Sequence, residues 1–218
     1  MEQARAAERE AGPAYTVTRQ YQLSAAGATQ PSSQVVAEVS FVPPAEKDFA
    51  IVKSEGNDHG VVHRLLQHEA SMTGHSQLYD LSPDNYNFAL LGRDTLDGHD
   101  CYVLQITPKR EAVELIRGKA WVDSQRFHVR RIEGETAKSP SIWIKQVQVT
   151  ISYGDVNGVW LETATRAVAD VRLAGPHVLT SRELDVRTAD LSARTTKPHI
   201  QRRNRAHLAA DTAAWVPR

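Results

Sequence analysis

Residues 96–173 constrain the fold most, because extended segments and turn signals alternate along them almost without a break. Within the segments, apolar residues recur at every second position, the period of a half-buried β-strand. Two of the breaks, Asp97-Gly98 and Asn157-Gly158, are residue pairs typical of two-residue hairpin turns. The region therefore predicts a large antiparallel meander, unlike a nucleotide-binding scaffold. The predicted strands are 101–107, 114–123, 127–133, 142–153 and 159–171.

Further strand patterns lie on both sides of this region. They cover residues 15–23, 35–41, 48–54, 87–92 and 178–186. Only Arg19 falls on the otherwise apolar side of the first of them. A sheet of roughly ten strands is more than a flat sheet carries without curling. We therefore predict a mainly β fold with few helices (α+β), in which a large curved antiparallel sheet forms an unclosed half-barrel.

One helix is predicted inside this β region, at about residues 58–73. Asn57-Asp58 can cap it, and Gly74 follows it. Its apolar residues recur near the helical spacing of 3.6; they are Val61, Val62, Leu65, Leu66 and Met72. A helix with such a stripe must lay it against a face of the sheet. We therefore expect this helix to form a lid on the concave face.

The length of 218 residues fits one large all-β domain, which we place at residues 13–188. Residues 1–12 predict a frayed helical segment, and residues 189–218 a basic tail. From position 193 onward the chain has six basic residues and one acidic residue, although the whole chain has no net charge. The overall balance gives no electrostatic footprint for nucleic acid. The tail is interpreted as a solvated end, and contact with anionic lipid headgroups, a peripheral membrane contact, is the functional alternative.

Other features bear on compartment. Cys101 is the single cysteine, so no intrachain disulfide can form. No apolar stretch approaches the about 18 residues that span a bilayer. The first ten residues are rich in charge and do not resemble a signal peptide. A periplasmic location is therefore expected only on the assumption that a leader has been removed.

The sequence gives little support for a catalytic or metal-binding site. His59 and His63 have the i, i+4 spacing of helical metal ligands, but His68 falls off that face and no H-E-x-x-H motif is present. We expect these histidines and His75 to face solvent, with pH-sensitive opening of the lid as an alternative. Cys101 lacks an evident base and is expected to be an inert thiol. We predict no enzyme activity, no catalytic residue, no metal and no cofactor.

Several motifs carry a family resemblance. The run LDGHDCYVLQITPK at 96–109 is followed by GKAWVD at 118–123, VRRIEG at 129–134 and Trp160-Leu161. This pattern resembles the LolA/LolB-like superfamily of periplasmic outer-membrane lipoprotein-sorting proteins, which includes RseB-type sensors. The resemblance implies an unclosed barrel with a helical lid over a hydrophobic cavity that takes acyl chains. The chain departs from the superfamily in having one clear lid helix and no cysteine near its start.

The resemblance predicts a periplasmic protein that binds lipid acyl chains or lipoproteins, in lipoprotein sorting or transport at the outer membrane. The alternative is a non-catalytic envelope-stress sensor or interaction module of the RseB type, which engages an envelope protein partner. No nucleic-acid partner is expected. Strand phase and helix face select the cavity residues. They are Val39, Phe41, Leu65, Leu66, Leu104, Ile116, Val122, Val149, Ile151 and Leu161.

Overall fold

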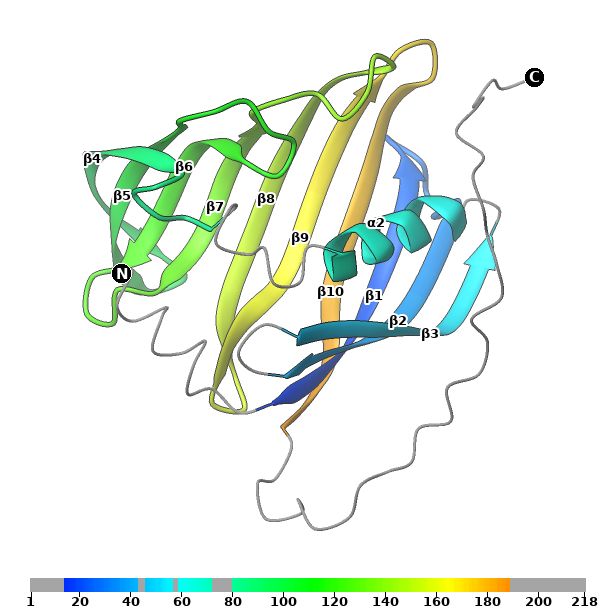
Figure 1. Cartoon of the computed structure of the whole chain (residues 1–218), viewed down its shortest axis with the longest axis horizontal. Coiled ribbons are helices and arrows are strands. Elements are labelled where there is room, and N and C mark those ends of the chain that lie inside the picture. The colour runs from blue at the N-terminus through cyan, green and yellow to red at the C-terminus, as the bar shows by residue number, and fades with distance from the viewer. Residues whose placement is uncertain (1–13, 43–45, 57–58, 72–79, 189–218) are drawn as a thin grey trace.

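A computed structural model describes residues 14–42, 46–56, 59–71 and 80–188. Within these residues the chain forms ten strands and one helix (Figure 1). The elements are β1 (Tyr15–Ala25), β2 (Ser33–Val42), β3 (Glu46–Gly56), α2 (His59–Ser71), β4 (Tyr86–Leu96), β5 (His99–Pro108), β6 (Ile116–Asp123), β7 (Val129–Thr136), β8 (Ile144–Val156), β9 (Val159–Val171) and β10 (Gly175–Thr188). The segments predicted at 1–12 and 189–218, together with Met72, Gly74 and His75, lie outside the described residues.

The strands form a single antiparallel sheet in the order β3-β2-β1-β10-β9-β8-β7-β6-β5-β4. Since β3 and β4 are its two edges, the sheet of the described residues is not closed into a barrel, and the predicted mainly β, unclosed fold is confirmed. β3 and β4 are also consecutive strands in the chain. Their connection must cross from one edge to the other, and it contains α2. Figure 1 shows α2 lying in front of the β10-β1-β2 part of the sheet.

One face of the sheet can be followed from edge to edge through directly paired residues. From β4 to β3 they are Leu90, Leu104, Ala120, Ile132, Ile151, Thr165, Ser181, Tyr21, Val35 and Ser54. Tyr21 and Val35 are packed with Leu66 of α2. This row therefore marks the side of the sheet that α2 covers, here called the lid face.

Two separate groups of buried side chains lie on the lid face. The helix cluster contains Val17, Tyr21, Val35, Ala37, Val39, Val62, Leu66, Val159, Leu161 and Val186. The loop cluster contains Leu81, Tyr86, Ile106, Leu115, Ala120, Val122, Val129, Ile132 and Ala137. The loops before β4 and β6 help to close the loop cluster, where the Ile116 amide donates to the Tyr86 hydroxyl over 3.0 Å. The core is thus divided between the two ends of the sheet.

Both predicted hairpin turns are confirmed by their backbone angles. Asp97 and Gly98 have φ of 51° and 79°, and Asn157 and Gly158 have φ of 54° and 81°. Two successive residues in this left-handed region match the type I′ turn, whose twist suits paired strands. These turns set the register of the β4-β5 and β8-β9 hairpins, in which Leu96 pairs with His99 and Val156 with Val159.

Candidate functional site

The first candidate site is the middle of the lid face, between the two clusters. Val149, Ala167 and Leu179 are paired across β8, β9 and β10. Ile151 and Thr165 form the next pair along β8 and β9. All five side chains are half-buried rather than buried; together they are called the middle strip. Leu179 packs against the helix cluster and Ile151 against the loop cluster. The strip is therefore a largely apolar, incompletely covered surface that joins the two cores.

Helix α2 packs on the sheet through its apolar stripe and makes a polar contact from its last turn. Val62 and Leu66 are buried in the helix cluster, and Leu65 packs against it. At the other end of the helix, His68 Nε2 lies 3.2 Å from Glu114 Oε1. Glu114 comes directly before Leu115 of the loop cluster, so the helix reaches from one cluster to the other. The His68 side chain is 52% exposed, and such surface contacts contribute at most about 1 kcal/mol.

The predicted cavity residues do reach the lid face, but in groups rather than as one continuous wall. Val39, Leu66 and Leu161 are buried in the helix cluster, with Leu65 against it. Val122 is buried in the loop cluster, with Leu104, Ile116 and Ile151 against it. Val149 lies in the middle strip, and Phe41 lies near a strand end with its ring 5.4 Å from that of Tyr15.

The buried members of this set are already enclosed by protein. Leu66 is 1% exposed, and Val39, Val122 and Leu161 are also buried. While α2 is seated, only half-buried members such as Leu65, Val149 and Ile151 have surface left for a ligand. A ligand that touched Leu66 would have to displace the helix.

A satisfied ion pair lies next to the middle strip. Arg19 Nη1 donates to Glu162 Oε1 over 2.6 Å, and Arg19 Nη2 donates to the Glu162 carbonyl oxygen. The Thr165 hydroxyl also donates to Glu162 Oε1, over 2.6 Å. Burial alone would raise the pKa of Glu162, but Arg19 and Thr165 hold this pKa below its ordinary value. The sequence places Arg19 on the apolar side of its strand but does not indicate the pair, because Glu162 lies 143 positions away.

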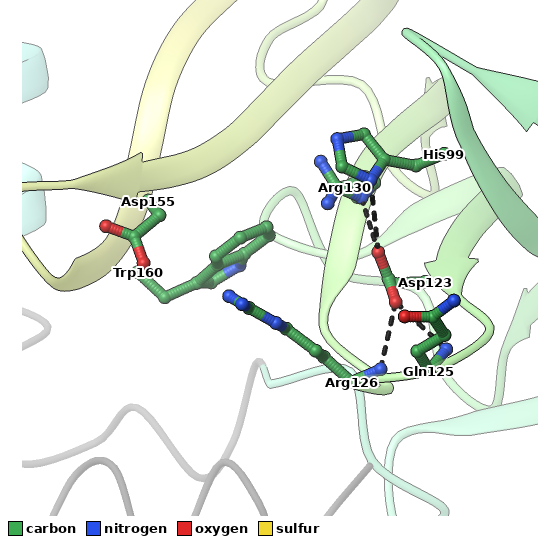
Figure 2. A pocket seen from close by; sticks show the side chains of 7 residues that line it. All are labelled: His99, Asp123, Gln125, Arg126, Arg130, Asp155 and Trp160. Carbon is green, nitrogen blue, oxygen red and sulfur yellow. Dashed lines mark hydrogen bonds and ion pairs between the residues drawn. The ribbon is translucent and has the colours of Figure 1, made fainter.

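The second candidate site is a pocket of about 410 Å³ that no sequence motif indicates. Figure 2 shows the seven side chains that line it. They are His99 of β5, Asp123 of β6, Gln125 and Arg126 of the β6-β7 turn, Arg130 of β7, Asp155 of β8 and Trp160 of β9. Asp123 lies at the end of β6 and Asp155 close to the β8-β9 turn, where aspartate is common. No spacing in the sequence indicates that the two lie at one pocket.

Asp123 organises the pocket. Its Oδ1 accepts the backbone N–H groups of Gln125 and Arg126, each over 2.9 Å. Its Oδ2 accepts Arg130 Nε over 2.8 Å. Burial would raise the pKa of Asp123, but these donors outweigh it and lower the pKa from 3.8 to about 2. The carboxylate therefore stays ionised and fixes both the turn and Arg130.

Trp160 forms the opposite wall of this pocket. Its chain neighbours Val159 and Leu161 are buried in the helix cluster. Because successive side chains of a strand point to opposite sides, Trp160 projects away from that cluster. The Arg130 guanidinium lies 5.4 Å from the centre of its ring, and Trp160 Nε1 donates to the Val129 carbonyl over 3.2 Å. None of the residues that line the pocket is a member of either cluster.

The two described histidines of the predicted group, His63 and His68, have different neighbours. His63 is exposed and meets Phe49 edge-on at 6.1 Å, and His68 contacts Glu114. The His59 side chain and His75 are not among the described parts. Within the described residues, no three His, Cys, Asp or Glu side chains are grouped to hold a metal ion.

Two further features concern the cysteine and the helix. Cys101 is fully buried, and burial raises the pKa of its thiol. The single described helix is too short and too polar to cross a membrane.

Comparison with solved structures returns proteins of the group that the motifs resemble. A LolA superfamily protein from Nitrosomonas europaea is 15% identical and aligns over 85% of this chain and 91% of its own, with a TM-score of 0.46. A domain assigned to outer membrane lipoprotein sorting, from Vibrio parahaemolyticus, is 12% identical over 86% and 89%, with a TM-score of 0.49. The MucA/MucB complex of Pseudomonas aeruginosa contains a chain that is 9% identical over 85% and 97%, with a TM-score of 0.28.

The sequence comparisons give a narrower result. No curated protein matches the chain. A family model described as "-like: Uncharacterized protein" matches residues 62–175, which include most of α2, the strands of the loop cluster and the residues that line the pocket around Asp123. Because this model covers more than half of the chain, the protein belongs to that family.

Proposed function

We propose that the protein is a non-catalytic binding protein of the periplasm that holds acyl chains of lipids or lipoproteins on the lid face, in lipoprotein sorting or transport at the outer membrane. The observation that carries the proposal is the middle strip, which is apolar, half-buried and placed between two packed clusters. The resemblance of the motifs at 96–134 to lipoprotein-sorting proteins supports the same ligand class.

The energetics favour such a ligand. Burying apolar surface stabilises a complex by about 0.8 kcal/mol per methylene, so five methylenes laid on the strip contribute about 4 kcal/mol. A longer contact would need access to Leu66 and Val39, which α2 covers. The lid then has to tilt, and the exposed contact of His68 with Glu114 is the weaker of its two attachments. Binding thus couples ligand length to displacement of α2.

The direct test is titration of the purified protein with a fluorescent fatty acid, in parallel with native mass spectrometry for lipid carried through purification. Val149→Asn places an amide in the strip, and it should weaken fatty-acid binding about tenfold, because an unpaired polar group replaces apolar contact. Val168→Asn is the matched control, since Val168 is also half-buried but lies next to Ala167 in β9 and so points to the other side. A protein that takes up no fatty acid, or an equal effect of both variants, would contradict the proposal.

A second function, a regulatory interaction module with an envelope protein partner, is favoured by the β4 edge. Leu90 and Leu91 are 64% and 52% exposed on this edge strand. An open strand edge with apolar side chains suits the addition of a strand from another protein. Capture of a partner from an envelope extract, lost on Leu91→Lys and kept on Val149→Asn, would support this function. Capture that is insensitive to Leu91→Lys would argue against it.

A further inference from the structure

The pocket around Asp123, here called the polar pocket, shares no lining residue with the two clusters or with the middle strip. Its volume of about 410 Å³ falls in the range of small-molecule sites, about 300–1,000 Å³. The pocket is polar on one side and aromatic on the other, as Figure 2 shows for Arg126, Arg130 and Trp160. It therefore has the features of a separate ligand site.

Some hydrogen-bond donors of Arg126 and Arg130 are bound to Asp123, and others have no acceptor in the described part of the chain. Asp123 engages the Nε of Arg130, and the terminal nitrogens of Arg130 have no acceptor among the described residues. The Arg126 backbone N–H is bound to Asp123, whereas its guanidinium, which extends toward Trp160 in Figure 2, has no partner in the described part of the chain. Two guanidinium groups thus line one pocket with hydrogen-bonding capacity left over.

The positions of these groups are preorganised. The Arg130 side chain is only 15% exposed and is clamped between the buried Asp123 carboxylate and the Trp160 ring. The Arg126 backbone is fixed by its N–H bond to the same carboxylate. Since Asp123 is already saturated with donors, it repels an incoming anion less than a free carboxylate would. Guanidinium groups bind carboxylates and phosphates through paired, charge-assisted hydrogen bonds.

We propose that this pocket binds a small organic oxyanion, a carboxylate or phosphate group carried on an apolar body. Arg126 and the terminal nitrogens of Arg130 bind the oxyanion, and the indole of Trp160 packs against the body. His99, which lies 3.9 Å from Asp123, adds positive charge when protonated. Asp155 forms the rim, where one of its oxygens accepts the Gly158 N–H over 2.9 Å, and its charge limits the affinity for anions.

The test is calorimetric titration of the full chain with phenyl phosphate and benzoate, with inorganic phosphate as the probe that lacks an apolar body. Arg126→Gln should weaken phenyl phosphate binding at least tenfold, and Asp155→Asn should strengthen it. Arg166→Gln is the matched control, because Arg166 is exposed on β9 and does not line the pocket. All three side chains are exposed, so circular dichroism should report an unchanged fold.

A second arm identifies the source of the oxyanion. Co-sedimentation with phosphatidylglycerol vesicles that is lost on Arg126→Gln would assign it to a lipid headgroup. Binding of the soluble probes without co-sedimentation would assign it to a soluble ligand. The proposal is overturned if none of the three soluble probes binds and co-sedimentation does not depend on Arg126, or if Arg126→Gln and Arg166→Gln behave alike. Fatty-acid binding on the lid face should not change in Arg126→Gln, so the two proposals can fail independently.

Discussion

Asp123 is a buried carboxylate whose oxygens are satisfied by hydrogen bonds. It is 5% exposed, and its oxygens accept two backbone N–H groups and one guanidinium nitrogen. A buried carboxylate is tolerated in a protein when its hydrogen bonds are satisfied in this way. The same bonds hold the end of β6, the following turn and Arg130 of β7 together. A single acidic side chain therefore stabilises this end of the sheet and shapes the polar pocket.

Replacing Asp123 by Asn should lower the free energy of unfolding by about 2 kcal/mol at neutral pH, since a pKa change of one unit corresponds to about 1.36 kcal/mol. The pKa of Asp123 is lower in the folded state, from 3.8 to about 2. Its stabilisation is therefore fully present above pH 3.8 and is lost as the pH falls through about 2. Urea unfolding at several pH values should show the gap between wild type and variant closing over that interval. Asp170→Asn, at an exposed carboxylate 3.3 Å from Lys145, is the control, and an equal effect there would contradict the assignment.

At the scale of elements, the packing of α2 on the sheet determines which lid-face side chains a ligand can reach. The helix is seated on the sheet by a stripe in which Val62 and Leu66 are buried, while neighbouring positions such as Arg64 and Gln67 are exposed. The sheet beneath it offers Tyr21 and Val35, which are also fully buried. Packing rather than hydrogen bonding thus sets the attachment of this end of the helix.

Leu66→Ala should destabilise the protein by about 2–5 kcal/mol, because it removes buried methyl groups and leaves a cavity. Gln67→Ala, at the next and exposed position, should change the free energy of unfolding by less than about 0.5 kcal/mol. Chemical denaturation followed by circular dichroism measures both. If Leu66→Ala had no more effect than Gln67→Ala, then α2 would not be packed on the sheet in solution as described.

At the scale of the whole molecule, one connection determines how the lid is placed. Sequential strands β3 and β4 lie at opposite edges of the sheet, and α2 lies between them in the chain. α2 packs on the helix cluster and meets the other half of the molecule where His68 approaches Glu114. The division of the core into two clusters leaves the middle strip between them.

Glu114→Gln should weaken the link between α2 and the loop cluster without unfolding the protein. We expect a bound fluorescent fatty acid to dissociate several times faster, while the free energy of unfolding changes by less than about 1 kcal/mol. Glu111→Gln serves as the control, since Glu111 is more exposed and contacts Arg117 rather than the helix. Stopped-flow displacement measures the dissociation rates, and identical rates in the two variants would show that the contact does not restrain the lid.

Parts of the candidate sites could be predicted from the sequence and parts could not. Strand phase correctly brought Leu104, Ile151 and Val149 to one face, because side chains alternate with a period of two. It could not tell which of these positions neighbouring segments would bury, since burial depends on loops such as 80–86. The polar pocket was missed for the same reason. Its residues come from five strands and one turn, and each alone has an ordinary local role.

The sequence by itself determined the class of structure: alternating apolar positions, Asp97-Gly98 and Asn157-Gly158 specify antiparallel hairpins through local backbone geometry, and the stripe at 61–66 specifies a helix. Only the tertiary structure decided that β1 pairs with β10, that the core splits in two, and that Arg19 meets Glu162. The physical reason is the distance along the chain over which each interaction acts. Periodicity and turn chemistry act between residues a few positions apart, whereas pairing, burial and pocket formation depend on which distant segments the folded chain brings into contact.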